Sequence, residues 1–233
     1  MATKVKFCGI TSPSDAERAV SAGAWAIGLI LWPGSARACD PAIASEIAAA
    51  LRRRVEVVAV LVNPSLDELT ELAEVIQPTI IQLHGEEGPA FCAEAARRTG
   101  CRVIKAVRVR SGADIQALEP YKTGYHLLDS HAEGLRGGTG RTFSWELARA
   151  HRGRTPVILS GGLTPENVGE AIRSVRPFAV DVASGVERAP GRKDPAKLDA
   201  FARAVKEAGP HAAPPRPAHA PAGGSVHARS RTS

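Results

Sequence analysis

The sequence has few aromatic residues, no paired cysteine motif and no hydrophobic run long enough to cross a membrane. Phe, Trp and Tyr make up only 4% of the 233 residues, which argues against a surface on which nucleic-acid bases stack. The longest apolar run, "AWAIGLILW" at 24–32, is too short to span a bilayer and predicts a buried strand. The four cysteines are Cys8, Cys39, Cys92 and Cys101, and they show neither a C-x-x-C pair nor zinc-type spacing with histidine. Because no signal peptide precedes them, the expected location is the reducing cytoplasm.

Positive charge is concentrated in the last part of the chain. The segment from Pro210 holds Arg216, Arg229 and Arg231 and no acidic residue, so residues 1–209 carry 27 basic and 24 acidic groups. That mild excess suits a small anionic substrate better than a nucleic-acid backbone, and three arginines without aromatics are too few for nucleic-acid binding. Because residues 210–233 are rich in Pro, Ala, Ser and Gly without apolar periodicity, we predict a folded domain at 1–209 and a disordered tail.

Apolar, β-branched runs alternate with Ala-rich amphipathic segments throughout residues 1–209. Helix-start signals follow several of the runs: "SPSD" at Ser12, "DP" at Asp40, "SLDE" at Ser65, "TPEN" at Thr164 and "DPAK" at Asp194. The expected strands are residues 4–10, 24–31, 55–62, 79–83, 102–109, 124–129, 156–160 and 178–183. Eight such units predict an α/β fold, a single-domain (β/α)8 TIM barrel; the alternative is a doubly wound open sheet, whose glycine-rich dinucleotide turn after the first strand is missing.

In such a barrel, catalytic groups lie at the carboxyl ends of the strands. Cys8 ends the first strand in "KVKFC", and Asp129 ends the sixth in "YHLLDS". Each has an alternative role, since a cysteine can be inert packing and an aspartate can cap a helix or loop. His84, in "IQLHGEE", either lines a pocket or is a hydrogen-bonded structural histidine. The other three cysteines fall at a helix start, within a helix and before a strand, and are predicted to be inert.

Glycine-rich segments follow strands six, seven and eight. "LSGGLTPEN" and "VASGVE" predict a phosphate site, because glycines there let backbone N–H groups approach an anion. "EGLRGGTGRTFSW", residues 133–145, either closes over substrate or is an idle insertion, and Arg141 within it contacts an anion or is a solvated charge.

Strand parity predicts two further placements. Lys6 shares parity with Cys8, and Asp181 lies on the last strand, which neighbours the first in a closed barrel, so the two side chains are expected to pair inside it. His126 has the opposite parity to Asp129 and is expected to face the helices.

Several of these segments together resemble phosphoribosylanthranilate isomerase, the tryptophan-pathway enzyme, over residues 4–207. They are "VKFCGIT", "ILWPGSAR", "VAVLVN", "IQLHGEE", "LLDS", "GGTGRTFSW", "ILSGGLTPENV" and "VDVASGVE…GRKD". The resemblance implies that Cys8 is the general base and Asp129 the general acid. It also implies a set of substrate contacts: Arg37 for the anthranilate carboxylate, Gln82 and His84 lining the pocket, Gly161, Gly162, Ser184 and Gly185 for the phosphate, and the loop from Gly138 to Arg141 over the sugar. The sequence departs from the family in "ARAC" around Arg37, in Arg141 where Lys is frequent, and in Ala183 where Ser is common.

The implied reaction is an Amadori rearrangement by acid–base catalysis, without a metal, nucleotide or covalent cofactor. The expected partner is a small phosphorylated substrate, with neither nucleic acid nor membrane, in a monomer or homodimer. One alternative is the histidine-pathway isomerase or a dual-substrate enzyme, but the paired aspartates of that family at strands one and five are replaced by Cys8 and "KAVRVRSG". The other is a catalytically inactive phosphosugar-binding barrel.

Overall fold

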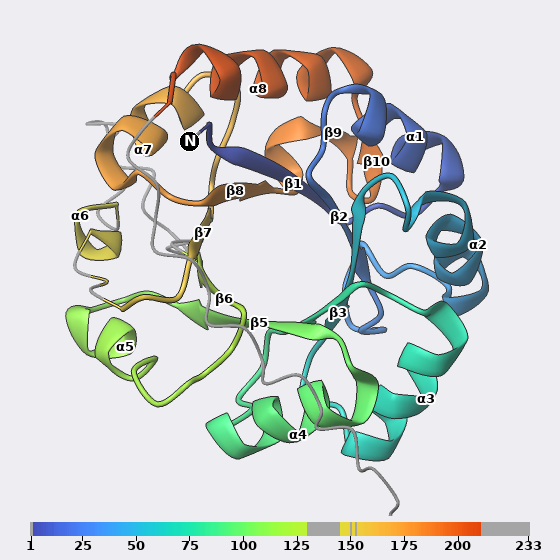
Figure 1. The fold of residues 1–233 in the computed structure, drawn as a ribbon. Coiled ribbons are helices and arrows are strands. Elements are labelled where there is room, and N and C mark those ends of the chain that lie inside the picture. Colours follow the sequence, from blue (N-terminus) through green and yellow to red (C-terminus); the bar gives the residue numbers. More distant parts are fainter. Residues whose placement is uncertain (1, 130–144, 150, 152, 211–233) are drawn as a thin grey trace, which may run out of the picture.

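The computed structural model describes residues 2–129, 145–149, 151 and 153–210. Eight parallel strands form a closed barrel in which each strand pairs with the next and β8 pairs with β1, as Figure 1 shows in a view down the barrel. The strands are β1 (Lys4–Cys8), β2 (Ala26–Ile30), β3 (Glu56–Leu61), β4 (Ile80–Leu83), β5 (Arg102–Arg108), β6 (Tyr125–Asp129), β7 (Val157–Ser160) and β8 (Ala179–Val182). The predicted TIM barrel is therefore confirmed.

A helix follows each strand and covers the outside of the barrel (Figure 1). The helices are α1 (Pro13–Ser21), α2 (Pro41–Leu51), α3 (Leu66–Ile76), α4 (Pro89–Thr99), α5 (Gly112–Gln116), α6 (Trp145–Ala148), α7 (Val168–Val175) and α8 (Pro195–Glu207). Ser12, Asp40, Ser65 and Asp194 cap α1, α2, α3 and α8 through their side chains, as the start signals predict. Among the described residues, no helix is both long and apolar enough to cross a bilayer.

Three features of the boundaries differ from the expectations. Thr164 does not begin α7, which starts at Val168: the Asn167 side chain accepts from the Thr164 N–H and donates to the Gly162 carbonyl, and this local bonding holds a turn before the helix. Trp145, expected at the end of a loop, is buried and is the first residue of α6. The first strand is also shorter than predicted, because Gly9 has a φ of +72° and ends it directly after Cys8.

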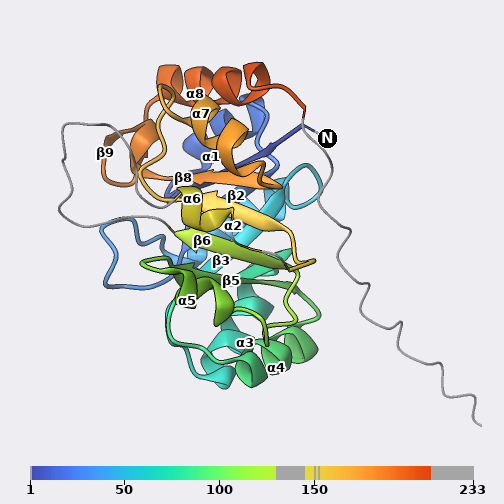
Figure 2. The same ribbon diagram turned by 90° about the vertical axis from the view of Figure 1, so that its left-hand side faces the viewer.

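The segment between β8 and α8 holds a feature that the sequence pattern did not predict. After a 3₁₀ turn, η1 (Ser184–Val186), the strands β9 (Glu187–Ala189) and β10 (Arg192–Lys193) form a short antiparallel hairpin. Figure 2 shows β9 at the end of the barrel opposite the start of β1. The hairpin therefore lies at the carboxyl ends of the strands, where the candidate catalytic groups are.

Candidate active site

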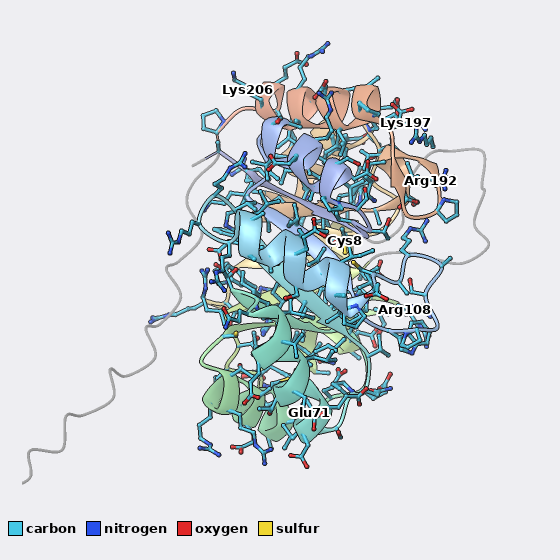
Figure 3. All side chains as sticks on the ribbon, turned by 90° about the vertical axis from the view of Figure 1, so that its right-hand side faces the viewer. Cys8, Glu71, Arg108, Arg192, Lys197 and Lys206 are labelled. Carbon is cyan, nitrogen blue, oxygen red and sulfur yellow. The ribbon has the colours of Figure 1, made fainter. Side chains whose placement is uncertain are left out.

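Cys8 is buried at the carboxyl end of β1, beside a glycine of the next strand. Cys8 and Gly28 are register partners, and a Cβ atom built on residue 28 would lie 2.7 Å from the Cys8 Sγ and 3.1 Å from the Lys6 Nζ. Figure 3 shows Cys8 inside the barrel, nearer the side with Arg108 and Arg192 than the side with Lys206. Because Gly28 has no side chain, the Cys8 thiol and the Lys6 ammonium group can both lie close to its Cα atom.

Lys6 and Asp181 form the predicted ion pair inside the barrel. Their strands pair in the register Lys6↔Asp181, the Nζ to Oδ1 distance is 2.7 Å, and both side chains are buried. The Ser160 hydroxyl donates to the other carboxylate oxygen at 3.1 Å. Burial would lower the pKa of Lys6, but the charges and hydrogen bonds of Asp181 and Cys8 together outweigh burial, and the pKa is raised. Lys6 is therefore a fixed positive charge next to Cys8.

The electrostatic environment of Cys8 contains two opposing influences. Burial raises the pKa of the thiol above its ordinary value, and the nearby Lys6 and Lys193 partly oppose that rise. Burial also raises the pKa values of Cys39 and Cys92, both to about 11. Cys8 is thus distinguished from the other cysteines by its position among cations at a strand end, whereas Cys39 and Cys92 lie in the predicted inert positions before α2 and within α4.

Asp129 is the last residue of β6, and a short chain of polar groups approaches it from β4. The His84 Nε2 lies 3.7 Å from the Asp129 Oδ2, and the His84 Nδ1 lies 2.8 Å from the Gln82 Nε2. An amide nitrogen can only donate, so the His84 Nδ1 accepts from Gln82, and the His84 Nε2 faces Asp129. The Gln82 Oε1 is buried and has no hydrogen-bond partner among the described residues.

Arg37 follows β2 and is held by a residue that the sequence did not indicate. Its Nε lies 2.9 and 3.0 Å from the two Glu187 carboxylate oxygens, and a terminal nitrogen lies 2.7 Å from one of them. Lys193 contacts the same carboxylate at 2.9 Å. Glu187 and Lys193 lie in the "GVE…GRKD" stretch that resembles the family. That stretch has no strand or helix periodicity, so the sequence did not predict that either side chain is buried.

The loops after β7 and β8 lie against each other at the predicted phosphate site. Gly161 and Gly162 have φ values of +97° and +62°, which favour glycine, and a Cβ atom on Gly185 would lie 1.9 Å from the Leu163 carbonyl oxygen. Ser184 begins η1 in the second loop. The structure thus brings these four predicted residues together, whereas Gly138 and Arg141 lie outside the described residues.

His126 lies on the helix-facing side of β6, as its parity predicts. Its Nδ1 is 3.0 Å from the His151 Nε2, and its Nε2 is 3.3 Å from the Tyr121 carbonyl oxygen. Within the described ranges, no three His, Cys, Asp or Glu side chains come together as a metal site would require.

A closed (β/α)8 barrel with a thiol, a carboxylate and several cations at the carboxyl ends of its strands has the organisation of a barrel enzyme. The sequence model of the family described as N-(5'phosphoribosyl)anthranilate (PRA) isomerase matches residues 5–204. The chain is 47% identical over 205 residues to N-(5'-phosphoribosyl)anthranilate isomerase of Pseudomonas putida, covering 87% of this chain and 97% of that protein.

Solved structures of phosphoribosyl anthranilate isomerases also match this chain. Phosphoribosyl anthranilate isomerase of Thermotoga maritima matches with a TM-score of 0.79 and 40% identity over 88% of this chain and 99% of that chain. A phosphoribosyl anthranilate isomerase solved with reduced 1-(o-carboxyphenylamino)-1-deoxyribulose 5-phosphate matches with a TM-score of 0.75 and 37% identity, again over 88% and 99%. The chain belongs to the N-(5'-phosphoribosyl)anthranilate isomerase family.

Proposed function

We propose that this isomerase uses Cys8 as general base and Asp129 as general acid to convert N-(5'-phosphoribosyl)anthranilate to 1-(2-carboxyphenylamino)-1-deoxyribulose 5-phosphate, a step of tryptophan biosynthesis. The observation that carries the proposal is the position of the two groups: each is the terminal residue of a barrel strand, Cys8 on β1 and Asp129 on β6. The family membership supplies the reaction, and these two side chains supply its proton transfers.

The reaction runs in two proton-transfer stages. Asp129 donates a proton to the furanose ring oxygen as the bond from C1′ to that oxygen breaks, and the nitrogen lone pair forms the C1′=N bond of a protonated Schiff base. The Cys8 thiolate then removes the proton on C2′, and the electron pair of that bond forms the C1′=C2′ bond of an enolamine while nitrogen regains its lone pair. The enolamine tautomerises to the ketone.

Lys6 makes the base step feasible in a buried site. The thiol must be anionic to accept the proton, and burial raises its pKa. The Lys6 ammonium, held by Asp181, stabilises the thiolate by opposite charge. Because the thiol pKa is raised, kcat/KM is expected to increase with pH through the alkaline range as the thiolate fraction grows.

The remaining predicted residues are assigned to substrate binding. Arg37 is assigned to the anthranilate carboxylate, and Gln82 and His84 are assigned to the wall of the pocket, where the Gln82 amide lies 2.8 Å from the His84 ring. The phosphate is assigned to the loops after β7 and β8, a frequent phosphate site in barrels; the four residues are Gly161, Gly162, Ser184 and Gly185. The loop containing Gly138 and Arg141 stays a prediction, as do the cytoplasmic location and the monomeric or homodimeric state.

The decisive test is the Cys8→Ser enzyme, followed by the fluorescence decay of phosphoribosylanthranilate. A hydroxyl keeps the size but ionises far less readily, so turnover should fall by about two to four orders of magnitude, as should that of Asp129→Asn. Cys39→Ser is the matched control and should keep turnover. Near wild-type turnover of Cys8→Ser would show that Cys8 is not the base. The histidine-pathway aminoaldose, assayed in parallel, tests the dual-substrate alternative.

A further inference from the structure

One buried carboxylate, that of Glu187 in β9, holds two cations from different parts of the chain. Its two oxygens accept from the Arg37 guanidinium at 2.7 to 3.0 Å, and Oε1 also accepts from the Lys193 Nζ at 2.9 Å. The side chains of Glu187 and Lys193 are 5% and 0% exposed, whereas that of Arg37 is 26% exposed. The accessible part of this cluster is therefore the guanidinium.

Glu187 occupies only one edge of the Arg37 guanidinium. The contacts use Nε and the terminal nitrogen beside it, in the two-point geometry typical of an arginine–carboxylate pair. A guanidinium carries five N–H groups, so the other terminal nitrogen keeps donors for a second carboxylate. The Arg37 side chain also lies against the loop that follows the thiol, since its Cδ is 2.9 Å from where a Cβ atom of Gly9 would be.

Lys193 connects the same carboxylate to the end of β1. Its ammonium has three acceptors, the Cys8 carbonyl at 2.6 Å, the Ala183 carbonyl at 3.1 Å and Glu187. Its contact with Glu187 also sets the charge of the cluster, because two cations share one carboxylate and the three side chains together carry one net positive charge. A lone Glu187 would neutralise Arg37; with Lys193 present, the cluster remains attractive to an anion.

We propose that Glu187 is a positioning residue, which orients the free edge of Arg37 toward the aryl carboxylate of the substrate and thereby makes the β9–β10 hairpin a specificity element for that group. The proposal rests on the proposed contact between Arg37 and the anthranilate carboxylate. Lys193 has a supporting role, since it offsets the charge of Glu187 and fixes the carbonyl of Cys8 relative to Arg37. Recognition of the carboxylate and placement of the base are in this way built on one buried cluster.

The test measures discrimination for the carboxylate rather than activity alone. Two inhibitors are compared, reduced 1-(o-carboxyphenylamino)-1-deoxyribulose 5-phosphate and the same compound without the ring carboxylate. The wild-type protein should bind the first more tightly, and Glu187→Gln should shrink that advantage about tenfold, the effect of one misaligned charged contact, with Ki for the second compound unchanged. In turnover, KM should rise more than kcat falls.

Arg37→Ala separates the role of Glu187 from the proposed function. If Arg37→Ala leaves the discrimination intact, the assigned role of Arg37 is wrong. If Arg37→Ala abolishes discrimination but Glu187→Gln preserves it, Glu187 does not position Arg37, and only the positioning role is wrong. In the double variant, Glu187→Gln should not reduce the discrimination further than Arg37→Ala alone does, because both changes remove the same interaction with the ring carboxylate.

A milder variant covers the case in which Glu187→Gln does not fold. Glu187→Asp keeps the negative charge near both cations but withdraws the carboxylate by one methylene, so the two-point contact with Arg37 is lost. Its discrimination should fall between those of the wild type and Arg37→Ala. Discrimination equal to that of the wild type would contradict the proposal, because it would show that the alignment of Arg37 does not matter.

Discussion

At the amino ends of the strands the barrel interior is closed by the rings of Trp25, Tyr125 and Phe178, whereas at the carboxyl ends it holds buried charges. The ring centroids lie 5.1 to 5.5 Å apart, and the Lys4 Nζ lies 5.0 Å from the Phe178 ring. Such contacts stabilise the fold at little desolvation cost, because few polar groups are buried with them.

The carboxyl end is built from groups that are costly to bury. Lys6, Asp181, Glu187 and Lys193 are all buried, and each depends on its partner for stabilisation. Apolar residues of similar volume would often be as stable, so stability does not explain why these charges are there. Their placement around Cys8 and Arg37 explains them. The barrel thus has a stabilising end and a chemical end, as is usual in this fold.

Lys6→Met should have the largest effect on the barrel interior. It leaves Asp181 buried without its cation, which should lower the free energy of unfolding by about 3–5 kcal/mol, and it removes the positive charge beside the thiol. Turnover should fall by at least about tenfold, and the rise of kcat/KM with pH should move to higher pH. Denaturant unfolding and pH–rate profiles measure the two effects.

Phe178→Leu is the matched change at the other end. It should lower the free energy of unfolding by about 1–1.5 kcal/mol through lost packing and leave kcat unchanged below the melting temperature. If Phe178→Leu altered kcat as much as Lys6→Met, the division between the two ends would be wrong.

His126, near the amino end of β6, should make the stability of the protein depend on pH. Its pKa lies at about 4, below the ordinary 6.5, because burial disfavours the charged ring, and His151 and Lys122 add to that effect. Between these pH values the unfolded chain binds a proton that the folded chain does not, so the free energy of unfolding should fall by about 3 kcal/mol as pH drops from 6.5 to 4.

His126→Gln tests this assignment, since an amide does not titrate. Denaturant unfolding curves at a series of pH values should show a smaller loss of stability for the variant than for the wild type, with kcat at neutral pH preserved. An undiminished pH dependence would mean that another group is responsible.

Gly28→Ala should affect catalysis with a small change in stability. The added methyl would lie 2.7 Å from the Cys8 Sγ, so the thiol must move, and a displacement of about 1 Å can cost up to about 100-fold in rate. We expect kcat to fall by about 10- to 100-fold. In Gly124→Ala, before β6, the new methyl would be 3.4 Å from the nearest atom, the Val103 carbonyl oxygen, and kcat should be unchanged. Equal effects of the two substitutions would show that catalysis does not depend on the close approach of the Cys8 thiol to Gly28.

The sequence predicted those features of the barrel that depend on local pattern. Apolar runs predicted all eight strands. Strand parity and the closure of the barrel together predicted the pairing of Lys6 with Asp181, because side chains alternate along a strand and the last strand lies beside the first. The contact between Arg37 and Glu187 joins residues 150 positions apart, and β10 has only two residues. Such a short hairpin has no periodicity to detect, so its part in the site could be found only from the structure.

The smallest expected effect is that of removing residues 210–233. The last helix packs on the barrel through Leu198, Phe201 and Val205, all before Gly209, and the family match ends at residue 204. The alignment with the Pseudomonas putida relative covers 97% of that protein but only 87% of this chain. We therefore propose that residues 1–209 form the catalytic domain. Truncation after Gly209 should leave the melting temperature and kcat unchanged. A lower melting temperature would show that the removed segment packs on the barrel, and a lower kcat alone would show that it reaches the active site.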